Sequence, residues 1–158
     1  MTSDERRRKI GKIRDLPPLL EGAVRGLNDA QLDTPYRQGG WTVRQVVHHL
    51  ADSHMNAVVR MKLILTEEKP SLKPYDQDAW AVLPDALKVP IGVSMEIIHG
   101  LHDRWFRLLE SVAEDAWSRA GYHPERGDVT LESMLTTYAE HGEKHVGQIM
   151  GLRRAKGW

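Results

Sequence analysis

The final third of the chain carries two histidines, His141 and His145, four residues apart in a segment with a helical pattern. Residues at this spacing stand one above the other on an α-helix, about 6 Å apart along the axis and about 40° apart around it. Both imidazoles therefore project the same way, beside the apolar residues Met134 and Leu152. Two imidazoles that face the interior of a helical bundle suit a divalent metal ion. The same spacing also fits two histidines that only form hydrogen bonds in the core.

A metal site needs more than two ligands, and a second group of histidines follows Trp41. His49 lies at the border of the apolar stripe of its predicted helix, in line with Ser53 and Asn56, where a side chain can reach the interior. His54 lies deeper in the stripe and is either the alternative third ligand or a core histidine. Spacing alone leaves both candidates open.

The remaining histidines have ordinary interpretations. On a helical wheel His48 and Asp52 fall away from the apolar stripe, which predicts a solvated surface for both. His99 and His102 lie off the centre of the stripe of a later helix, and His123 falls in a turn. Their side chains need no metal or catalytic role to explain them.

Composition excludes several classes of protein. The chain has no cysteine, so a bound metal must use nitrogen or oxygen ligands. Its 22 Lys and Arg balance 22 Asp and Glu, which leaves no net field to attract a nucleic acid. No segment approaches the roughly 18 consecutive apolar residues of a membrane span, and the charged start has no signal-peptide core. We therefore expect a cytoplasmic protein without nucleic-acid or membrane partners.

The length of 158 residues suits one domain, and no repeat or flexible linker divides the chain. We expect a single domain over residues 1–158, with residues 1–15 as a flexible or peripheral N-terminal segment. Pro17 and Pro18 can open the first helix, because proline suits a first helical turn. Apolar residues at helical spacing carry this helix to about Asn28.

Two further helices have clear start signals. Thr42 and Gln45 form the pattern of a capping box, in which each side chain bonds the backbone of the other. The long stripe that follows contains Val43, Val47, Leu50, His54, Ala57, Val58, Met61 and Leu65. Thr130 is the expected cap of the last helix, which continues to about Arg154.

The segments between these helices are rich in proline. A short helix from Asp76 to Val82 is all that fits before a third long helix, which Ser94 is expected to cap and which ends before Ala120. The predicted stripe of that helix contains Ile97, Leu101, Trp105, Leu108 and Val112. Four amphipathic helices without a convincing strand predict an all-α four-helix bundle with long connections between helices.

Long runs of this sequence resemble the DinB-like metalloenzyme superfamily, and more narrowly its YfiT branch. The matching segments are Asp33 to Arg37, Gly39 to Asn56, Lys73 to Asp76, Leu101 to Trp105, Tyr122 to Pro124, Tyr138 with His141 and His145, and Gly157 with Trp158. They extend over nearly all of the chain after the first fifteen residues. Such long runs are much more specific than one pair of histidines.

This resemblance implies a four-helix bundle, commonly a homodimer, in which three histidines hold zinc or nickel. The ligands so implied are His49, His141 and His145. His54 matches a family residue that is not a ligand. The chain departs from the family at Glu140, where members often have tryptophan, and at Gln148, where they often have another histidine. These changes leave the ligands in place but affect their surroundings.

Three neutral imidazoles leave at least one coordination position open, as in catalytic zinc sites. By the resemblance we expect a metal-dependent hydrolase that activates water and acts on a small-molecule substrate. The alternatives are a metal-dependent S-transferase with a bacillithiol-type thiol as cosubstrate, and a non-catalytic metal-binding stress-response module. The candidates for a nearby base or orienting group are Asp52, Asn56, Glu140 and His102.

Overall fold

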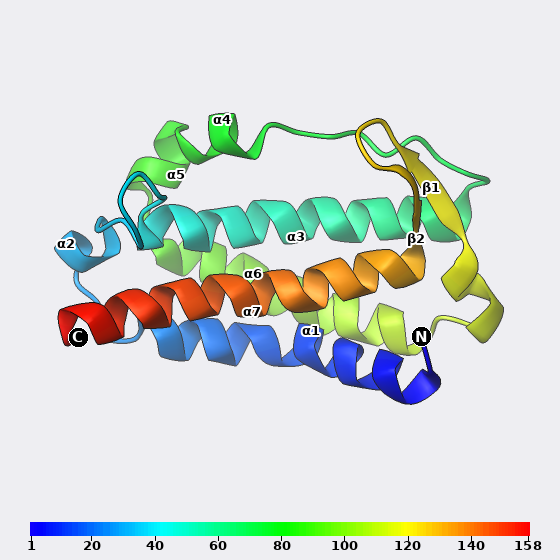
Figure 1. Cartoon of the computed structure of the whole chain (residues 1–158), viewed down its shortest axis with the longest axis horizontal. Helices are drawn as coiled ribbons and strands as arrows, with labels where there is room; N and C mark the ends of the chain where they lie inside the picture. The colour runs from blue at the N-terminus through cyan, green and yellow to red at the C-terminus, as the bar shows by residue number, and fades with distance from the viewer.

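The computed structural model describes residues 1–158, and four long helices run side by side in it (Figure 1). These helices are α1 (Ser3–Val24), α3 (Val43–Thr66), α6 (Ile91–Glu110) and α7 (Leu131–Lys156). The shorter elements are α2 (Asp29–Leu32), α4 (Gln77–Ala81), α5 (Pro84–Lys88), the 3-10 helix η1 (Glu114–Ser118), and the strands β1 (Ala120–His123) and β2 (Gly127–Thr130). The predicted four-helix bundle with long connections is confirmed. None of the helices combines the length and hydropathy needed to cross a membrane.

Helices α3 and α7 begin where the sequence predicts. The Gln45 N–H donates to the Thr42 hydroxyl oxygen at 3.1 Å, and the Thr42 N–H donates to Gln45 Oε1 at 2.8 Å. At the start of α7 the Ser133 N–H donates to the Thr130 hydroxyl oxygen at 3.0 Å. These caps satisfy N–H groups that have no partner within the helix, and they fix where the two histidine-bearing helices start.

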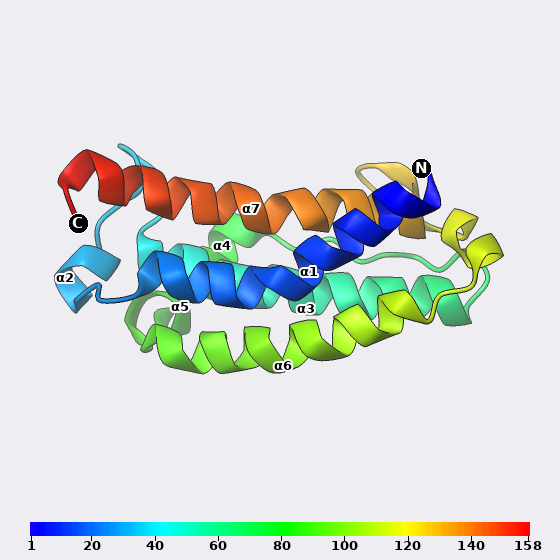
Figure 2. The ribbon, with the colours of Figure 1, turned by 90° about the horizontal axis from the view of Figure 1, so that it is seen from below.

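Helix α1 begins at Ser3, so the prediction of a helix opening at Pro17 is wrong. Thr2 caps this helix, and both Ile10 and Ile13 are buried in the core. Residues 3–15 are therefore a packed part of the bundle and not a peripheral segment. The packing of this apolar face outweighs the helix-breaking effect of a proline in mid-helix. Pro17 lies inside α1, and Figure 2 shows that α1 changes direction near its middle.

Helix α6 begins at Ile91, so Ser94 lies inside the first turns and is not the cap. Its buried residues are Ser94, Ile98, His102, Trp105 and Leu109. The predicted stripe is confirmed at Trp105, which is fully buried, and at Leu101 and Val112, which are partly buried against the core. It is wrong at Ile97, which is 42% exposed, whereas the neighbouring Ile98 is fully buried. The buried side of α6 also carries the polar residues Ser94 and His102, so apolar spacing alone does not define it.

A small hairpin was not expected. Strands β1 and β2 pair antiparallel, with Ala120 opposite Thr130 and His123 opposite Gly127. Leu72 of the long crossover adds a backbone bond, its N–H donating to the Tyr122 carbonyl at 2.8 Å. Strands of four residues are too short to show an alternating pattern in the sequence. The short helix expected between Asp76 and Val82 is present as α4, while α5 is an addition.

Two apolar clusters fill the bundle and leave a polar layer between them. One contains Ile10, Ile13, Ala57, Met61, Trp105, Leu109, Leu135 and Ala139, among others. The other contains Leu20, Ala23, Val43, Val47, Leu50, Ile98, Ile149 and Leu152, among others. On α3, α6 and α7 the buried residues between these two sets include His54, His102 and His145, and they form the polar layer, which α1 covers with Leu16 and Pro17. In this layer Leu16 of α1 packs so closely on Gly142 of α7 that a Cβ atom there would lie 2.5 Å from Leu16 Cδ2.

Candidate metal centre

Three imidazoles from two helices meet in the polar layer: His49 of α3 with His141 and His145 of α7. We call these three residues the histidine cluster. The Nε2 atoms of His49 and His145 each lie 3.2 Å from Nε2 of His141, and one ligand atom from each ring lies within 4.8 Å of the others. Tetrahedral ligands at a Zn–N distance of about 2.0 to 2.1 Å stand about 3.3 Å apart. The spacing of the cluster therefore fits a tetrahedral metal site with three nitrogen ligands.

The cluster is electrically neutral at neutral pH. Burial, together with a smaller effect of the neighbouring His145, lowers the pKa of His49 to about 3. Burial also lowers the pKa of His141 to about 3, with further contributions from His145 and His49. The pKa of His145 is lowered by burial as well. Neutral imidazoles are the form that binds a metal ion, since each has one nitrogen lone pair free.

Outer contacts orient the rings of the cluster. His145 Nδ1 donates to Gln148 Oε1 at 2.8 Å, so the lone pair of this neutral ring is on Nε2, the atom that faces His141. The Trp41 ring lies 4.6 Å from the His49 ring and stacks on the His145 ring at 6.4 Å. Trp41 and Gln148 therefore restrict the orientation of two of the three rings.

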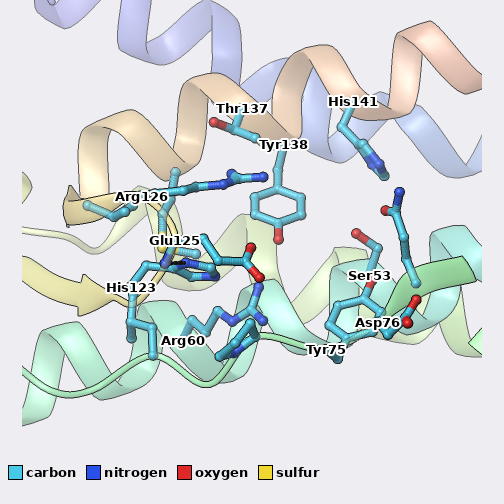
Figure 3. Close-up of a pocket in the computed structure, with 15 residues that line it drawn as sticks. Ser53, Arg60, Tyr75, Asp76, His123, Glu125, Arg126, Thr137, Tyr138 and His141 are labelled. Atoms are coloured by element: carbon cyan, nitrogen blue, oxygen red, sulfur yellow. Dashed lines mark hydrogen bonds between the residues drawn. The ribbon is translucent and has the colours of Figure 1, made fainter. Parts of the chain in front are cut away.

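A cavity of about 610 Å³ adjoins the cluster at His141 (Figure 3). It is lined by polar side chains from α3, the crossover, the hairpin and α7: Ser53, Arg60, Tyr75, Asp76, His123, Glu125, Arg126, Thr137 and Tyr138. Figure 3 shows the Tyr138 hydroxyl directed into the space between α3 and α7, beside His141. A small molecule in this cavity would contact the cluster through His141.

None of the four residues proposed as a base or orienting group, Asp52, Asn56, Glu140 and His102, lines this cavity. The Asn56 amide donates to the Asp52 carbonyl oxygen at 2.9 Å, which ties it to its own helix. Asp52 is half-buried, and burial raises the pKa of its carboxyl. Glu140 is exposed and accepts a bond from Lys9 at 2.9 Å, so it faces α1 and not the cluster. Its neighbour His141 points elsewhere because consecutive residues lie about 100° apart around a helix.

Several other histidines are more buried than predicted. His48, expected at the surface, is 6% exposed, and it donates from Nε2 to the Val89 carbonyl at 3.0 Å and accepts at Nδ1 from the Ser94 hydroxyl at 2.7 Å. His102, expected off the centre of its stripe, is 1% exposed. His54 is fully buried, and its Nε2 lies 3.1 Å from Nδ1 of His141. His49 and not His54 therefore joins the cluster, while His54 stands behind it.

Sequence reasoning did not assign a role to the side chains that line the cavity. His123, which the sequence predicts in a turn, ends β1, is buried, and lines the cavity. Arg60, Tyr75 and Arg126 come from elements with no shared period, so nothing in the sequence alone groups them. Tyr138 is the exception, because it precedes His141 by three residues and shares its helix face.

The bundle is therefore a helical protein whose middle layer gathers three neutral, largely buried imidazoles that could hold a metal ion beside a polar cavity. The model of the DinB superfamily matches residues 13–149, and the chain belongs to that family.

Individual relatives agree with this assignment. A protein of Oceanobacillus iheyensis named "putative metal-dependent hydrolase" is 49% identical over 149 residues, which cover 94% of this chain and 86% of that protein. A Bacillus cereus protein of the same name is 48% identical with the same coverage. YfiT from Bacillus subtilis, described as a probable metal-dependent hydrolase with an unusual four-helix bundle topology, is 43% identical with a TM-score of 0.97, covering 100% of this chain and 91% of that one. The four-helix bundle protein TT2238 is 16% identical with a TM-score of 0.59, covering 94% of this chain and 98% of that one, which shows a shared fold only.

Proposed function

We propose that the protein is a metal-dependent hydrolase whose divalent ion, zinc or alternatively nickel, is held by the histidine cluster. The observation that carries this proposal is that Nε2 of His141 lies 3.2 Å from Nε2 of both His49 and His145, close to the spacing of tetrahedral ligands, with one ligand atom of each ring within 4.8 Å of the others. The relatives named as metal-dependent hydrolases support it. A site with three protein ligands also leaves a position for water or substrate, which distinguishes catalytic from structural zinc sites.

The residues around the cluster suit a hydrolytic reaction. His49, His141 and His145 would hold the ion, which would supply the Lewis acidity that hydrolysis at neutral pH requires, towards a substrate oxygen and towards water. The Tyr138 hydroxyl can donate a hydrogen bond to negative charge that develops on the substrate. Arg60 and Arg126 can bind acceptor groups of the substrate from the other walls of the cavity.

The lining of the cavity indicates a polar substrate. Arg60 and Arg126 are accompanied by the acidic residues Asp76 and Glu125, so both signs of charge are present. Apolar residues are the minority of the lining. We therefore propose a small molecule that carries several hydrogen-bonding groups.

The test measures metal content and turnover in the same preparations. We expect the protein to bind Zn²⁺ or Ni²⁺ at one ion per chain and to hydrolyse one or more chromogenic esters, amides or phosphoesters. His49→Ala, His141→Ala and His145→Ala should each lose the metal and the turnover, whereas the exposed His99→Ala should keep both. Full metal binding by the first three variants would contradict the ligand set.

A second arm separates hydrolysis from thiol transfer. Monochlorobimane and a series of low-molecular-weight thiols, bacillithiol included, are incubated with the metal-loaded protein, and the fluorescent conjugate is measured. Thiol-dependent conjugation without any hydrolysis would reassign the protein as an S-transferase. Metal binding without either activity would favour the non-catalytic module.

The homodimer implied by the family resemblance stays a prediction. Large apolar side chains are exposed on the outer faces of α3 and α6, among them Val59, Val93 and Ile97. Size-exclusion chromatography with light scattering checks it, and a mass equal to one chain would contradict it.

A further inference from the structure

A row of hydrogen bonds connects the backbone of α1 to the histidine cluster. His102 Nδ1 lies 2.6 Å from the Ile13 carbonyl oxygen, and His102 Nε2 lies 2.8 Å from His54 Nδ1. His54 Nε2 lies 3.1 Å from His141 Nδ1. We call His102 and His54 the histidine row. Trp105 packs edge-on against both of its rings, at 5.5 and 5.6 Å between centroids, and this fixes their orientation.

The direction of every bond in the row follows from its first member. A carbonyl oxygen only accepts hydrogen bonds, so the proton of His102 is on Nδ1. The ring is buried without a carboxylate partner and is neutral, and its Nε2 must therefore accept. His54 then donates from Nδ1, and because this fully buried ring has no carboxylate partner to hold a second proton, its Nε2 accepts in turn.

The hydrogen bond between His54 and His141 determines the tautomer of His141. Since His54 Nε2 accepts, the proton of His141 is on Nδ1, and the lone pair of this ring is on Nε2. Nε2 of His141 is the atom that lies 3.2 Å from Nε2 of both other cluster histidines. The row therefore directs the lone pair of His141 to the place where a metal ion would be bound.

Pro17 explains why the Ile13 carbonyl is free to start the row. In an α-helix the carbonyl of residue 13 accepts from the N–H of residue 17, and proline has no N–H. The proline ring also collides with that carbonyl and bends the helix, which turns the oxygen away from the helix axis. A buried carbonyl without a helical partner needs another donor, and His102 supplies it.

We propose that Pro17 of α1 fixes the tautomer of His141 through the two histidines of the row. This proposal gives one explanation for three features of the bundle. They are the proline inside α1, the burial of His54 and His102, and the orientation of the His141 ring. His54 and His102 are positioning residues, because they act on the site only through His141. The consequence for metal affinity rests on the proposed metal site, whereas the tautomers exist in the metal-free protein as well.

The first experiment reads the tautomers directly. Long-range ¹H–¹⁵N correlation spectra of metal-free protein labelled with ¹⁵N-histidine, at neutral pH, distinguish a protonated from an unprotonated ring nitrogen. We expect His102, His54 and His141 to be protonated at Nδ1, the form that free histidine disfavours in water. A proton on Nε2 of His141 would overturn the proposal.

The second experiment tests the role of Pro17 with a matched control. Pro17→Ala restores an N–H that competes with His102 for the Ile13 carbonyl, so we expect mixed tautomers in the row and a loss of about fivefold or more in Zn²⁺ affinity. Pro18→Ala makes the same change one residue later, where the carbonyl that is released belongs to the exposed Arg14. It should keep the tautomers and the affinity of the parent. Thermal unfolding confirms that both variants are folded, and identical spectra for the two would overturn the role of Pro17.

The third experiment tests His54 by conservative rescue. His54→Leu removes the acceptor for His141 Nδ1, and we expect Zn²⁺ affinity, measured by competition with a chromophoric chelator, to fall about 10- to 100-fold. In His54→Gln the amide oxygen can accept the same bond, so most of the affinity should return. Equal losses in both variants would contradict a role through this hydrogen bond.

The outcomes separate this proposal from the proposed function. If the metal-free tautomers are as expected but neither Zn²⁺ nor Ni²⁺ binds, the row is confirmed and the metal site is wrong. If a metal binds to the cluster while His141 populates both tautomers in the metal-free protein, the metal site stands and the row does not fix it.

Discussion

The histidine cluster and the histidine row occupy the same layer of the bundle, yet they satisfy their ring nitrogens in different ways. In the row each ring donates from Nδ1 and accepts at Nε2, so every polar atom has a partner within the protein. In the cluster three Nε2 atoms face one another, and neutral rings cannot all pair in that arrangement. Burial alone therefore does not distinguish a structural from a ligating histidine, whereas the direction of its lone pair does.

This difference has an energetic consequence. A buried acceptor without a donor costs about 1 to 3 kcal/mol, and lone pairs that face one another also repel. The row is complete in the metal-free protein, whereas a cation bound between the three rings would satisfy the facing lone pairs of the cluster at once. We therefore expect metal ions to stabilise the folded protein through the cluster. The stability of the row should depend mainly on its hydrogen-bond partners.

The largest expected effect is the stabilisation of the protein by Zn²⁺. An ion that binds only the folded protein should raise the free energy of unfolding by about 4 kcal/mol at a free concentration 1,000 times its Kd. Urea unfolding with and without Zn²⁺ measures this gain. His145→Ala should lose nearly all of it, because two imidazoles bind zinc much more weakly than three, and an undiminished gain in that variant would place the ion elsewhere.

The second prediction concerns the loss of stability at acidic pH, and it applies to histidines of both the cluster and the row. The folded-state pKa is about 3 for His49 and His141 and about 4 for His102, below the unfolded value of 6.5 in each case. Between these values the unfolded chain binds more protons, so stability is fully present above about pH 6.5 and is lost as the pH falls. Each of the three should cost about 1.2 kcal/mol between about pH 7 and about pH 5.5. Urea unfolding of the metal-free protein at these two pH values checks this, and equal stability at both would contradict the neutral rings.

The helices and part of the cluster could be predicted from the sequence because they depend on local signals. The caps at Thr42 and Thr130 act within one turn, and the spacing of His141 and His145 fixes their common direction on any helix. Local signals do not decide whether His49 or His54 is the third member of the cluster, because both lie near the same apolar stripe. Only the packing of α3 against α7 determines which ring meets His141 and His145. Family resemblance supplied that choice in advance.

Other features depend on tertiary contacts that no local pattern encodes. A pair of prolines normally predicts a helix start, yet the packing of Ile10 and Ile13 extends α1 through Pro17. The histidine row could not be predicted from the sequence for the same reason. The free carbonyl on α1 and the histidine on α6 form a hydrogen bond only when the two helices pack together. His102, which has no evident role when it is considered alone in the sequence, bonds the Ile13 carbonyl in this contact.

The third prediction tests how tightly the packing of α1 holds the layer that both groups share. Gly142→Ala would place a Cβ atom 2.5 Å from Leu16 Cδ2, so we expect a loss of about 1 to 3 kcal/mol in unfolding free energy and weaker Zn²⁺ binding at the adjacent His141. Gly147→Ala on the same helix meets no atom within 4 Å and should be neutral or stabilising by up to about 1 kcal/mol. Chemical denaturation of both variants measures the contrast, and equal stabilities would show that α1 and α7 separate readily here.

The smallest expected effect belongs to Glu140, which neighbours His141 in sequence but lies outside the layer. Its carboxylate is paired with Lys9 on an exposed face, and this pairing lowers the pKa of the carboxyl. An exposed ion pair contributes little to stability, so Glu140→Gln should change the unfolding free energy by less than about 0.5 kcal/mol. Metal content and hydrolytic rate should stay the same as in the parent, because the side chain reaches neither the cluster nor the cavity. A drop in hydrolytic rate with unchanged metal content would contradict this placement and return Glu140 to the candidates for a catalytic base.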